Sequence, residues 1–206
     1  MSPFIAFLIA AVILAVTPGP GIAYVVARSV AGGRSEGLSS CLGTALGGLL
    51  HVLASALGVS LLIAQSALAF SAVKYIGAAY LIYLGIGLLR RRDPASVEVK
   101  VAAQGAGRAF REGILVEALN VKTALFFLAF LPQFVVASQP LVPQLVALGS
   151  ICVALNTAVD VLAVFAADRL LQSKLARAGR ARLLRRASGL TMLGLGACLA
   201  MAQRDS

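Results

Sequence analysis

The sequence predicts an all-α fold: a polytopic membrane helix bundle of about six transmembrane helices, arranged as two inverted three-helix repeats. Three observations support this prediction. Of the 206 residues, 60% are hydrophobic and only 13% are charged, against roughly 25% charged residues in soluble domains. Six apolar stretches approach the length that crosses ~30 Å of hydrocarbon. The basic residues lie in every second connection between these stretches.

The six candidate spans follow from the roughly 20 helical residues that one crossing requires. Spans two and three are separated only by a weakly polar patch around Gln65. The sixth span is short, because few residues separate Arg186 from Gln203, and a partial or re-entrant segment is the alternative there. The spans are residues 4–27, 37–64, 67–89, 113–136, 142–167 and 187–202.

The distribution of basic residues predicts the orientation. Connections one, three and five together hold fifteen of the 18 Lys and Arg residues, whereas connections two and four hold none. The positive-inside rule therefore places the odd connections in the cytoplasm and both termini outside. The net charge of +10 is thus interpreted as a topology signal. Nucleic acid is not expected as a partner, since no aromatic stacking platform accompanies the basic residues.

The chain is expected to form a single transmembrane transporter domain, residues 1–206. The basic third connection divides it into half-repeats of about 1–92 and 110–206, joined by a cytoplasmic linker at 93–109. Because three spans is an odd number, the two halves have opposite orientations, which is the inverted-repeat layout of many transporters. Cysteines lie only inside apolar stretches and without C-x-x-C spacing, so neither a disulfide framework nor a metal site is expected.

The first span is interrupted in its middle by Thr17, Pro18, Gly19 and Pro20. Each proline lacks a backbone N–H and crowds the carbonyl four residues earlier, so a regular helix cannot continue through this segment. In hydrocarbon the freed backbone groups must be satisfied by protein, water or a ligand. The break therefore indicates a polar cavity of the kind found in transporters; the alternative is a simple proline kink.

A second polar interruption, in the fourth span, is expected at the same depth. At ~1.5 Å per residue, nine helical residues place Gly19, Asn120 and Asp160 each about 13 Å from a cytoplasmic arginine. Asn156 lies one turn outward from Asp160 on the same helix face. Polar groups from three spans are therefore expected at one level near the membrane midplane.

The polar side chains at this level are the candidate site residues. An ionisable group inside a span costs about 2.5–3.5 kcal/mol, so it is usually paired or functional. Asp160 is the first candidate for proton coupling, with a structural ion pair to Lys122 as the alternative. Glu117 is the second; it lines the inner mouth or only reaches interfacial water. Lys122 either meets a substrate carboxylate or pairs with Asp160. The expected substrate-binding residues are Thr17, Pro18, Gly19, Pro20, Asn120, Lys122 and Asn156.

Other features of the spans are interpreted as packing. Gly43 and Gly47 place small residues on one helix face, where two helices can approach closely. His51, alone in the outer half of the second span, is interpreted as a hydrogen-bonded packing residue, with a proton relay as the alternative.

Several of these stretches together resemble the LysE/RhtB family of amino-acid exporters. They are residues 17–20, 43–58, 74–85, 110–113 and 119–134. The resemblance implies export of amino acids and related metabolites from the bacterial cytoplasm, driven by the proton-motive force, and a place in the inner membrane. The sequence departs from the family pattern at Gly21, usually Asn or Asp, and at Val121, usually Pro. These departures bear on the identity of the substrate.

The leading hypothesis is therefore a secondary transporter that exports amino acids or related small metabolites and uses the proton gradient. Its partners would be the substrate, protons and the lipid bilayer, with no cofactor, and a homo-oligomer is left open. The alternative is a non-transporting membrane scaffold or sensor subunit. An enzyme is not expected, because the sequence has no metal-ligand cluster, no nucleophile–base spacing and no soluble catalytic domain.

Overall fold

The computed structural model describes residues 3–65, 67–90, 102–136 and 138–170, with residues 186, 189, 190, 192–194, 196, 197, 200 and 201. The described residues form helices and short connections without strands, so the predicted all-α class is confirmed. The count of six spans and the inverted repeats stay predictions. The long helices are α1 (Pro3–Val16), α2 (Pro20–Gln65), α3 (Ala67–Arg90), α4 (Ala106–Ala118) and α6 (Leu141–Leu170), and α5 (Val121–Leu125) is a short one.

Length and composition identify the membrane-crossing candidates among the described residues. Two helical segments are long and apolar enough, Pro20–Gly58 with 39 residues and Leu141–Ala167 with 27. A third candidate is the pair Ala106–Ala118 and Val121–Phe134, which bends by 44° at its break. The interruption predicted in the fourth span is therefore present as a bend between two helices.

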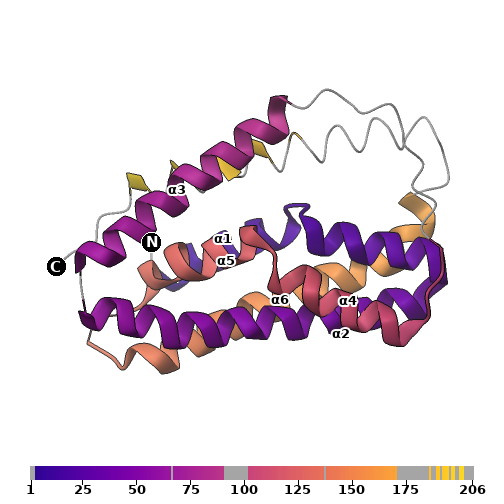
Figure 1. Ribbon diagram of the computed structural model, residues 1–206, viewed down its shortest axis with the longest axis horizontal. Helices are drawn as coiled ribbons and strands as arrows, with labels where there is room; N and C mark the ends of the chain where they lie inside the picture. The colour runs from indigo at the N-terminus through magenta and orange to yellow at the C-terminus, as the bar shows by residue number, and fades with distance from the viewer. Residues whose placement is uncertain are drawn as a thin grey trace.

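The first basic connection is a kink inside α2 and not a separate loop, which differs from the predicted division into spans. Gly32 (φ −122°, ψ 15°) and Gly33 (φ 69°, ψ −165°) depart from helical geometry within α2. A positive φ is costly for residues other than glycine, so Gly33 allows the chain to reverse there without a loop. The kink lies at the same end of the bundle as the beginning of α4 and the end of α6 (Figure 1). We call this end the basic end.

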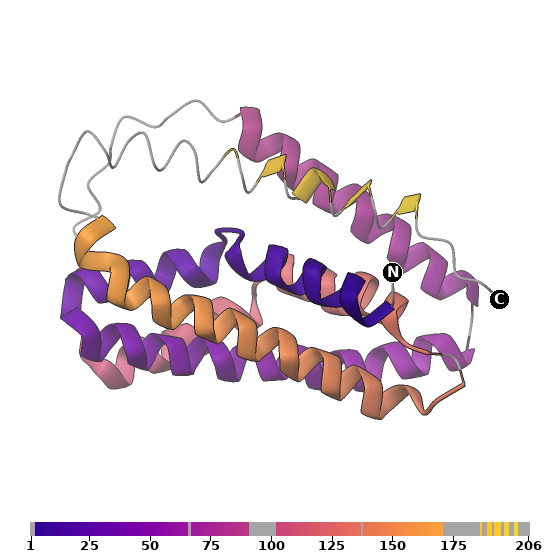
Figure 2. The same cartoon turned by 180° about the vertical axis from the view of Figure 1, so that it is seen from behind.

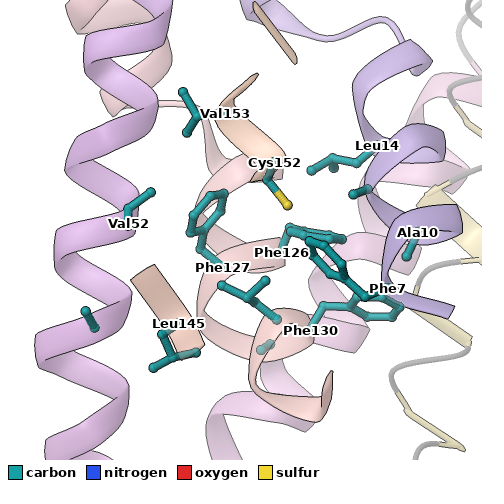
Figure 3. Close-up of a cluster of buried hydrophobic side chains, with 14 of the residues drawn as sticks. Phe7, Ala10, Leu14, Val52, Phe126, Phe127, Phe130, Leu145, Cys152 and Val153 are labelled. Carbon is teal, nitrogen blue, oxygen red and sulfur yellow. The ribbon is translucent and has the colours of Figure 1, made fainter. Parts of the chain in front are cut away.

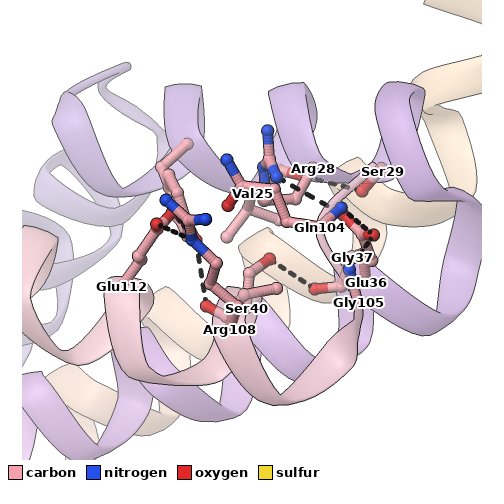
Figure 4. Close-up of polar contacts among 12 residues, drawn as sticks. Val25, Arg28, Ser29, Glu36, Gly37, Ser40, Gln104, Gly105, Arg108 and Glu112 are labelled. Atoms are coloured by element: carbon pink, nitrogen blue, oxygen red, sulfur yellow. Dashed lines mark hydrogen bonds and ion pairs between the residues drawn. The ribbon is translucent and has the colours of Figure 1, made fainter. Parts of the chain in front are cut away.

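A polar clasp holds the basic end together, formed by the buried Arg28 and Glu36 and by Gln104 and Gly105 (Figure 4). The Glu36 carboxylate accepts hydrogen bonds from the backbone N–H groups of Gln104 (2.7 Å) and Gly105 (2.6 Å). Its other oxygen lies 3.5 Å from Arg28 Nη1. Because α4 has no capping side chain of its own, Glu36 supplies the negative charge that a helix N-terminus favours. The clasp thus fixes the start of α4 against the kink of α2.

Close contact between α2 and α4 depends on glycine, as predicted for Gly43 and Gly47. A Cβ on Gly43 would collide with the carbonyl oxygen of Phe110, and one on Gly47 would lie 2.7 Å from that of Ile114. The approach is mutual, since a Cβ on Gly113 of α4 would lie 2.8 Å from the backbone of α2. The packing interpretation of these glycines is confirmed, and it brings the polar face of α2 next to α4.

The half of the bundle away from the basic end is filled by an aromatic core (Figure 3). After α5 the helix first widens into a π-helical turn, η1 (Phe126–Phe130), and then tightens into a 3₁₀ turn, η2 (Leu131–Phe134). Ring centroids lie 5.2 Å apart for Phe126 and Phe130, and 5.7 Å apart for Phe7 and Phe134. This core joins α1 to the chain that follows the break in the fourth span.

Helix α3 lies beside the described residues of the C-terminal segment (Figures 1 and 2). A Cβ on Gly85 would lie 2.8 Å from the carbonyl oxygen of Gly189, and one on Gly196 would lie 2.9 Å from that of Ala78. The described part of the predicted sixth span is therefore helical and packs closely on α3. The rest of residues 187–202, residues 91–101 and residues 171–185 lie outside the described residues, so the crossing of the sixth span stays a prediction.

Candidate functional site

The two broken helices meet midway along the bundle (Figure 1). α1 ends at Val16 and α2 begins at Pro20, whereas α4 ends at Ala118 and α5 begins at Val121. From the second break, Lys122 Nζ donates to the carbonyl oxygens of Leu14 (3.1 Å) and Thr17 (2.8 Å) at the first. One side chain therefore connects the two interruptions.

The carbonyl of Leu14 has no backbone donor within its helix, because proline lacks an N–H. Leu14 lies four residues before Pro18, whose missing N–H would otherwise bond to it. The Lys122 ammonium replaces this donor and places a positive charge at the C-terminus of α1, where the helix dipole favours one. A Cβ on Gly19 would lie 3.1 Å from Lys122 Nζ, so the small residue here gives the ammonium its space.

Lys122 is not the ion-pair partner of Asp160 within the part of the chain that the structure describes. Lys122 is buried, with 8% of the residue exposed. Its ammonium has three N–H donors, and two of them donate to carbonyls of the first break. The sequence-based alternative of a structural Lys122–Asp160 pair is therefore not observed. One N–H of Lys122 remains for a further acceptor.

The second break is organised by Glu117 and Asn120. The Asn120 side chain accepts from the backbone N–H of Lys122 (3.2 Å), which caps α5, and donates to Glu117 Oε2 (3.0 Å). The other carboxylate oxygen of Glu117 accepts from Thr123 Oγ1 at 2.6 Å. Both oxygens of Glu117 thus have donors from its own broken span, and its side chain is directed away from interfacial water: Glu117 is 7% exposed.

Helix α2 supplies donors to the carbonyls of this irregular span. His51 Nε2 lies 2.8 Å from the Glu117 carbonyl oxygen, so this nitrogen carries the proton and donates. One turn later Ser55 Oγ donates to the carbonyl of Phe127 in the π-helical turn (2.9 Å). Residues four apart share a helix face, so one face of α2 supports both irregular points. His51 has the hydrogen-bonded packing environment that was its first interpretation.

Asp160 faces the same region from α6. Its Oδ2 lies 3.0 Å from Thr44 Oγ1 of α2, and this hydroxyl also lies 3.0 Å from the carbonyl oxygen of Cys41. Asp160 and Thr44 are 7% and 4% exposed. The carboxyl is thus buried, with a neutral hydroxyl as its hydrogen-bonding neighbour.

These groups surround one cavity. Five of the expected substrate-binding residues line it, as do both acids expected for proton coupling. Pro18, within the break, and Pro20, the first residue of α2, do not line the cavity. The cavity is also lined by Thr44, Thr123 and Thr157, which were not predicted from the sequence. The spacing of Thr44 and Thr157 does not distinguish them from ordinary helix threonines. Thr123 directly follows Lys122, so its place beside the second break could have been predicted from the sequence. The expected residues at the cavity are Thr17, Gly19, Glu117, Asn120, Lys122, Asn156 and Asp160.

The lining has more acidic than basic side chains. It holds two carboxyl groups and one ammonium, and across the described residues neither carboxyl has a cationic side chain within ion-pair distance. No group of three potential metal ligands occurs in that part of the chain. The cavity can therefore receive a positively charged group or a proton on its acidic side.

Gly21, at the start of α2, sets the shape of this acidic side. A Cβ on Gly21 would lie 2.6 Å from Glu117 Oε2. The carboxylate thus occupies the space that a side chain at position 21 would need. Gly21 is one of the two positions at which the sequence departs from the LysE/RhtB pattern.

Comparison with known proteins gives the family. Residues 12–203 match the model of the LysE type translocator family. A homoserine/homoserine lactone efflux protein of Salmonella typhimurium is 33% identical over 144 residues, 70% of each chain. An uncharacterized membrane protein of Vibrio cholerae is 31% identical over 76% of each chain. An uncharacterized membrane protein of Bacillus subtilis is also 31% identical, over 73% of this chain and 76% of the relative. No solved structure matches. The protein is thus a membrane transporter and not an enzyme, and it belongs to the LysE type translocator family.

Proposed function

We propose that the protein is a secondary transporter that exports amino acids or related small metabolites from the cytoplasm, driven by the proton gradient. The observation that carries the proposal is the meeting of two helix breaks at a cavity lined by two carboxyls, one ammonium and two amides. Helices broken around a polar cavity are a recurring way to bind a charged substrate at membrane depth. The relative named for homoserine and homoserine lactone efflux supports a small amino acid or derivative as substrate.

The charges of the cavity fit the two ends of an amino acid. The substrate ammonium would contact Asp160 and Glu117, which have no cationic partner among the described residues. The substrate carboxylate would accept the remaining N–H of Lys122, next to Gly19. Asn156 would supply neutral hydrogen bonds from α6. A derivative without a free carboxylate would still use the acidic side of the cavity, so both kinds of substrate are expected to compete.

The two carboxyls are expected to have different roles. Glu117 accepts from Asn120 and Thr123, and an amide N–H can only donate. Both carboxylate oxygens of Glu117 are thus used as acceptors within its own broken span. Asp160 has a hydroxyl neighbour, which can donate or accept, and so it is suited to exchange a proton. A proton and a substrate ammonium would compete for Asp160, and that competition couples export to proton entry.

Reconstitution into proteoliposomes tests this proposal. The Asp160→Asn variant keeps size and hydrogen bonding but cannot exchange a proton. We expect it to lose amino-acid transport driven by a pH gradient while retaining exchange of labelled for unlabelled substrate. Glu112→Gln, which neutralises a carboxylate outside the cavity lining, is the matched control and should keep both activities. Pumping at the wild-type rate by Asp160→Asn would assign Asp160 a structural role.

A further inference from the structure

The hydroxyl of Thr44 has one proton and two acceptors within reach. Thr44 Oγ1 lies 3.0 Å from the Cys41 carbonyl oxygen, one turn back in α2, and 3.0 Å from Asp160 Oδ2. A hydroxyl donates one hydrogen bond and can accept others. The hydroxyl therefore cannot donate a full hydrogen bond to both oxygens at once.

We propose that Thr44 is a positioning residue that keeps Asp160 hydrogen-bonded in both of its protonation states. When Asp160 is ionised, the Thr44 hydroxyl donates to Oδ2. When Asp160 is protonated, its own O–H donates to Thr44 Oγ1, and the Thr44 hydroxyl turns to the Cys41 carbonyl. The Thr44 proton stays on its oxygen throughout, and only the exchanged proton enters or leaves. This inference rests on the proposed proton coupling through Asp160.

The surroundings of Asp160 leave this task to Thr44. The charged and titratable groups that act on Asp160 are Glu117 from α4, Lys122 from α5 and Cys41 from α2. Lys122 donates to α1, and Glu117 is occupied by donors of its own span. Among the described residues, Thr44 is the side chain whose hydrogen bond to Asp160 is observed. A buried carboxyl needs such a partner in each state, because an unpaired polar group there is costly.

Removal of the hydroxyl should change how tightly Asp160 holds its proton. The ionised form would lose a charge-assisted hydrogen bond, and the protonated form would lose a weaker neutral one. The balance therefore moves toward the protonated form. We expect the pH midpoint of gradient-driven transport to rise by about one pH unit.

The test compares Thr44→Val, which keeps the shape without the hydroxyl, with Thr44→Ser, which keeps the hydroxyl. Ser40→Ala is the matched control, since the Ser40 hydroxyl donates to Gly37, one turn back in the same helix (2.6 Å), and does not line the cavity. Two measurements are made on purified protein in proteoliposomes. One is the pH dependence of amino-acid transport. The other is the infrared difference spectrum between low and high pH, in which the protonated carboxyl band absent from Asp160→Asn belongs to Asp160.

We expect Thr44→Val to raise the transport midpoint and to move the Asp160 carboxyl band, whereas Thr44→Ser and Ser40→Ala match wild type. If Thr44→Val does not insert, Thr44→Ala provides the hydroxyl-free protein. An Asp160 band and midpoint unchanged by loss of the hydroxyl would overturn the inference and leave the proposed function standing. If no amino acid is transported by wild type, the proposed function fails, and the infrared measurement still decides whether Thr44 is hydrogen-bonded to the protonated carboxyl of Asp160.

Discussion

The break between α1 and α2 contains Pro18 and is followed directly by Pro20, the first residue of α2, whereas the break between α4 and α5 contains no proline. At the first break, the carbonyls of Leu14 and Thr17 accept from Lys122, more than a hundred residues away in the chain. The second break has a local cap, because Asn120 accepts from the backbone N–H of Lys122, and it has a further donor from α2, where His51 donates to the Glu117 carbonyl. The carbonyls of the first break therefore depend on a donor from the second break. The hydrogen bonds named at the second break do not use a donor from the first.

This asymmetry has a consequence for transport. Lys122 holds the end of α1 and also lines the cavity. A substrate carboxylate that attracts its ammonium would compete with the carbonyls of α1. Substrate binding and the position of α1 are thus expected to be coupled through one side chain.

Lys122→Met should have the largest effect, because it removes both donors to α1 from a buried site. Two hydrogen bonds from a charged group are lost and two carbonyls are left exposed to an apolar environment. We expect the free energy of unfolding in detergent to fall by about 2–4 kcal/mol and transport to be lost. The control is Arg108→Met, whose exposed pair with Glu112 should contribute less than about 1 kcal/mol. Equal losses for the two variants would contradict the capping role of Lys122.

Pro18→Ala combined with Pro20→Ala should affect transport more than stability. The new N–H at position 18 can bond to the Leu14 carbonyl and compete with Lys122 for it. α1 would then continue toward α2 and close the polar break. We expect inserted, folded protein with transport largely lost, measured by efflux and by size-exclusion chromatography. Efflux at the wild-type rate by the double variant would mean that the break is a simple proline kink without a role in transport.

The level of the site was predictable from the sequence because helical rise is constant. Counting nine residues from a basic connection placed Gly19, Asn120 and Asp160 at one depth, and the structure brings them to one cavity. The acceptor of Lys122 was not predictable. A lysine at midplane depth has several possible partners, and only the packing of α1 against the fourth span selects Leu14 and Thr17.

Other features depend on close packing and were missed for that reason. The clasp at Glu36 joins positions whose spacing in the sequence carries no periodic signal, and its donors are backbone N–H groups of Gln104 and Gly105. The turn η1 has the composition of an ordinary apolar helix. Its irregularity follows from the aromatic core and from Ser55, which satisfies the Phe127 carbonyl. Sequence pattern therefore predicted the breaks and the depth of the polar groups, and tertiary contacts determined the hydrogen bonds between them.

Ser55→Ala tests the support that α2 gives to the second broken span. The variant removes the donor to the Phe127 carbonyl in η1, and we expect a loss of about 1 kcal/mol in the free energy of unfolding. Ser29→Ala is the matched control, because this buried hydroxyl donates to the Val25 carbonyl of its own helix (2.8 Å) and the helix bonding there persists without it. A loss as large as that of Lys122→Met would mean that the two breaks are equally dependent on single donors.

Val121→Pro should have the smallest effect, and it should be stabilising. Val121 is the first residue of α5, where an N–H has no helical acceptor and proline is accommodated. The preceding residue, Asn120, has φ −75° and ψ 100°, close to the extended conformation that a following proline imposes. The second break therefore already has the backbone of a proline break, and the substitution would mainly restrict the unfolded chain. We expect a gain of about 0.4–1 kcal/mol in the free energy of unfolding with transport retained.

The position of the substitution, and not proline in general, should decide this result. Ala124→Pro, three residues later, removes the backbone hydrogen bond from Ala124 to the Asn120 carbonyl (2.9 Å). It should cost about 3 kcal/mol or more, measured by the same unfolding experiment. If Val121→Pro is also strongly destabilising, Asn120 is not held in an extended conformation, and the self-capped second break described above would be wrong.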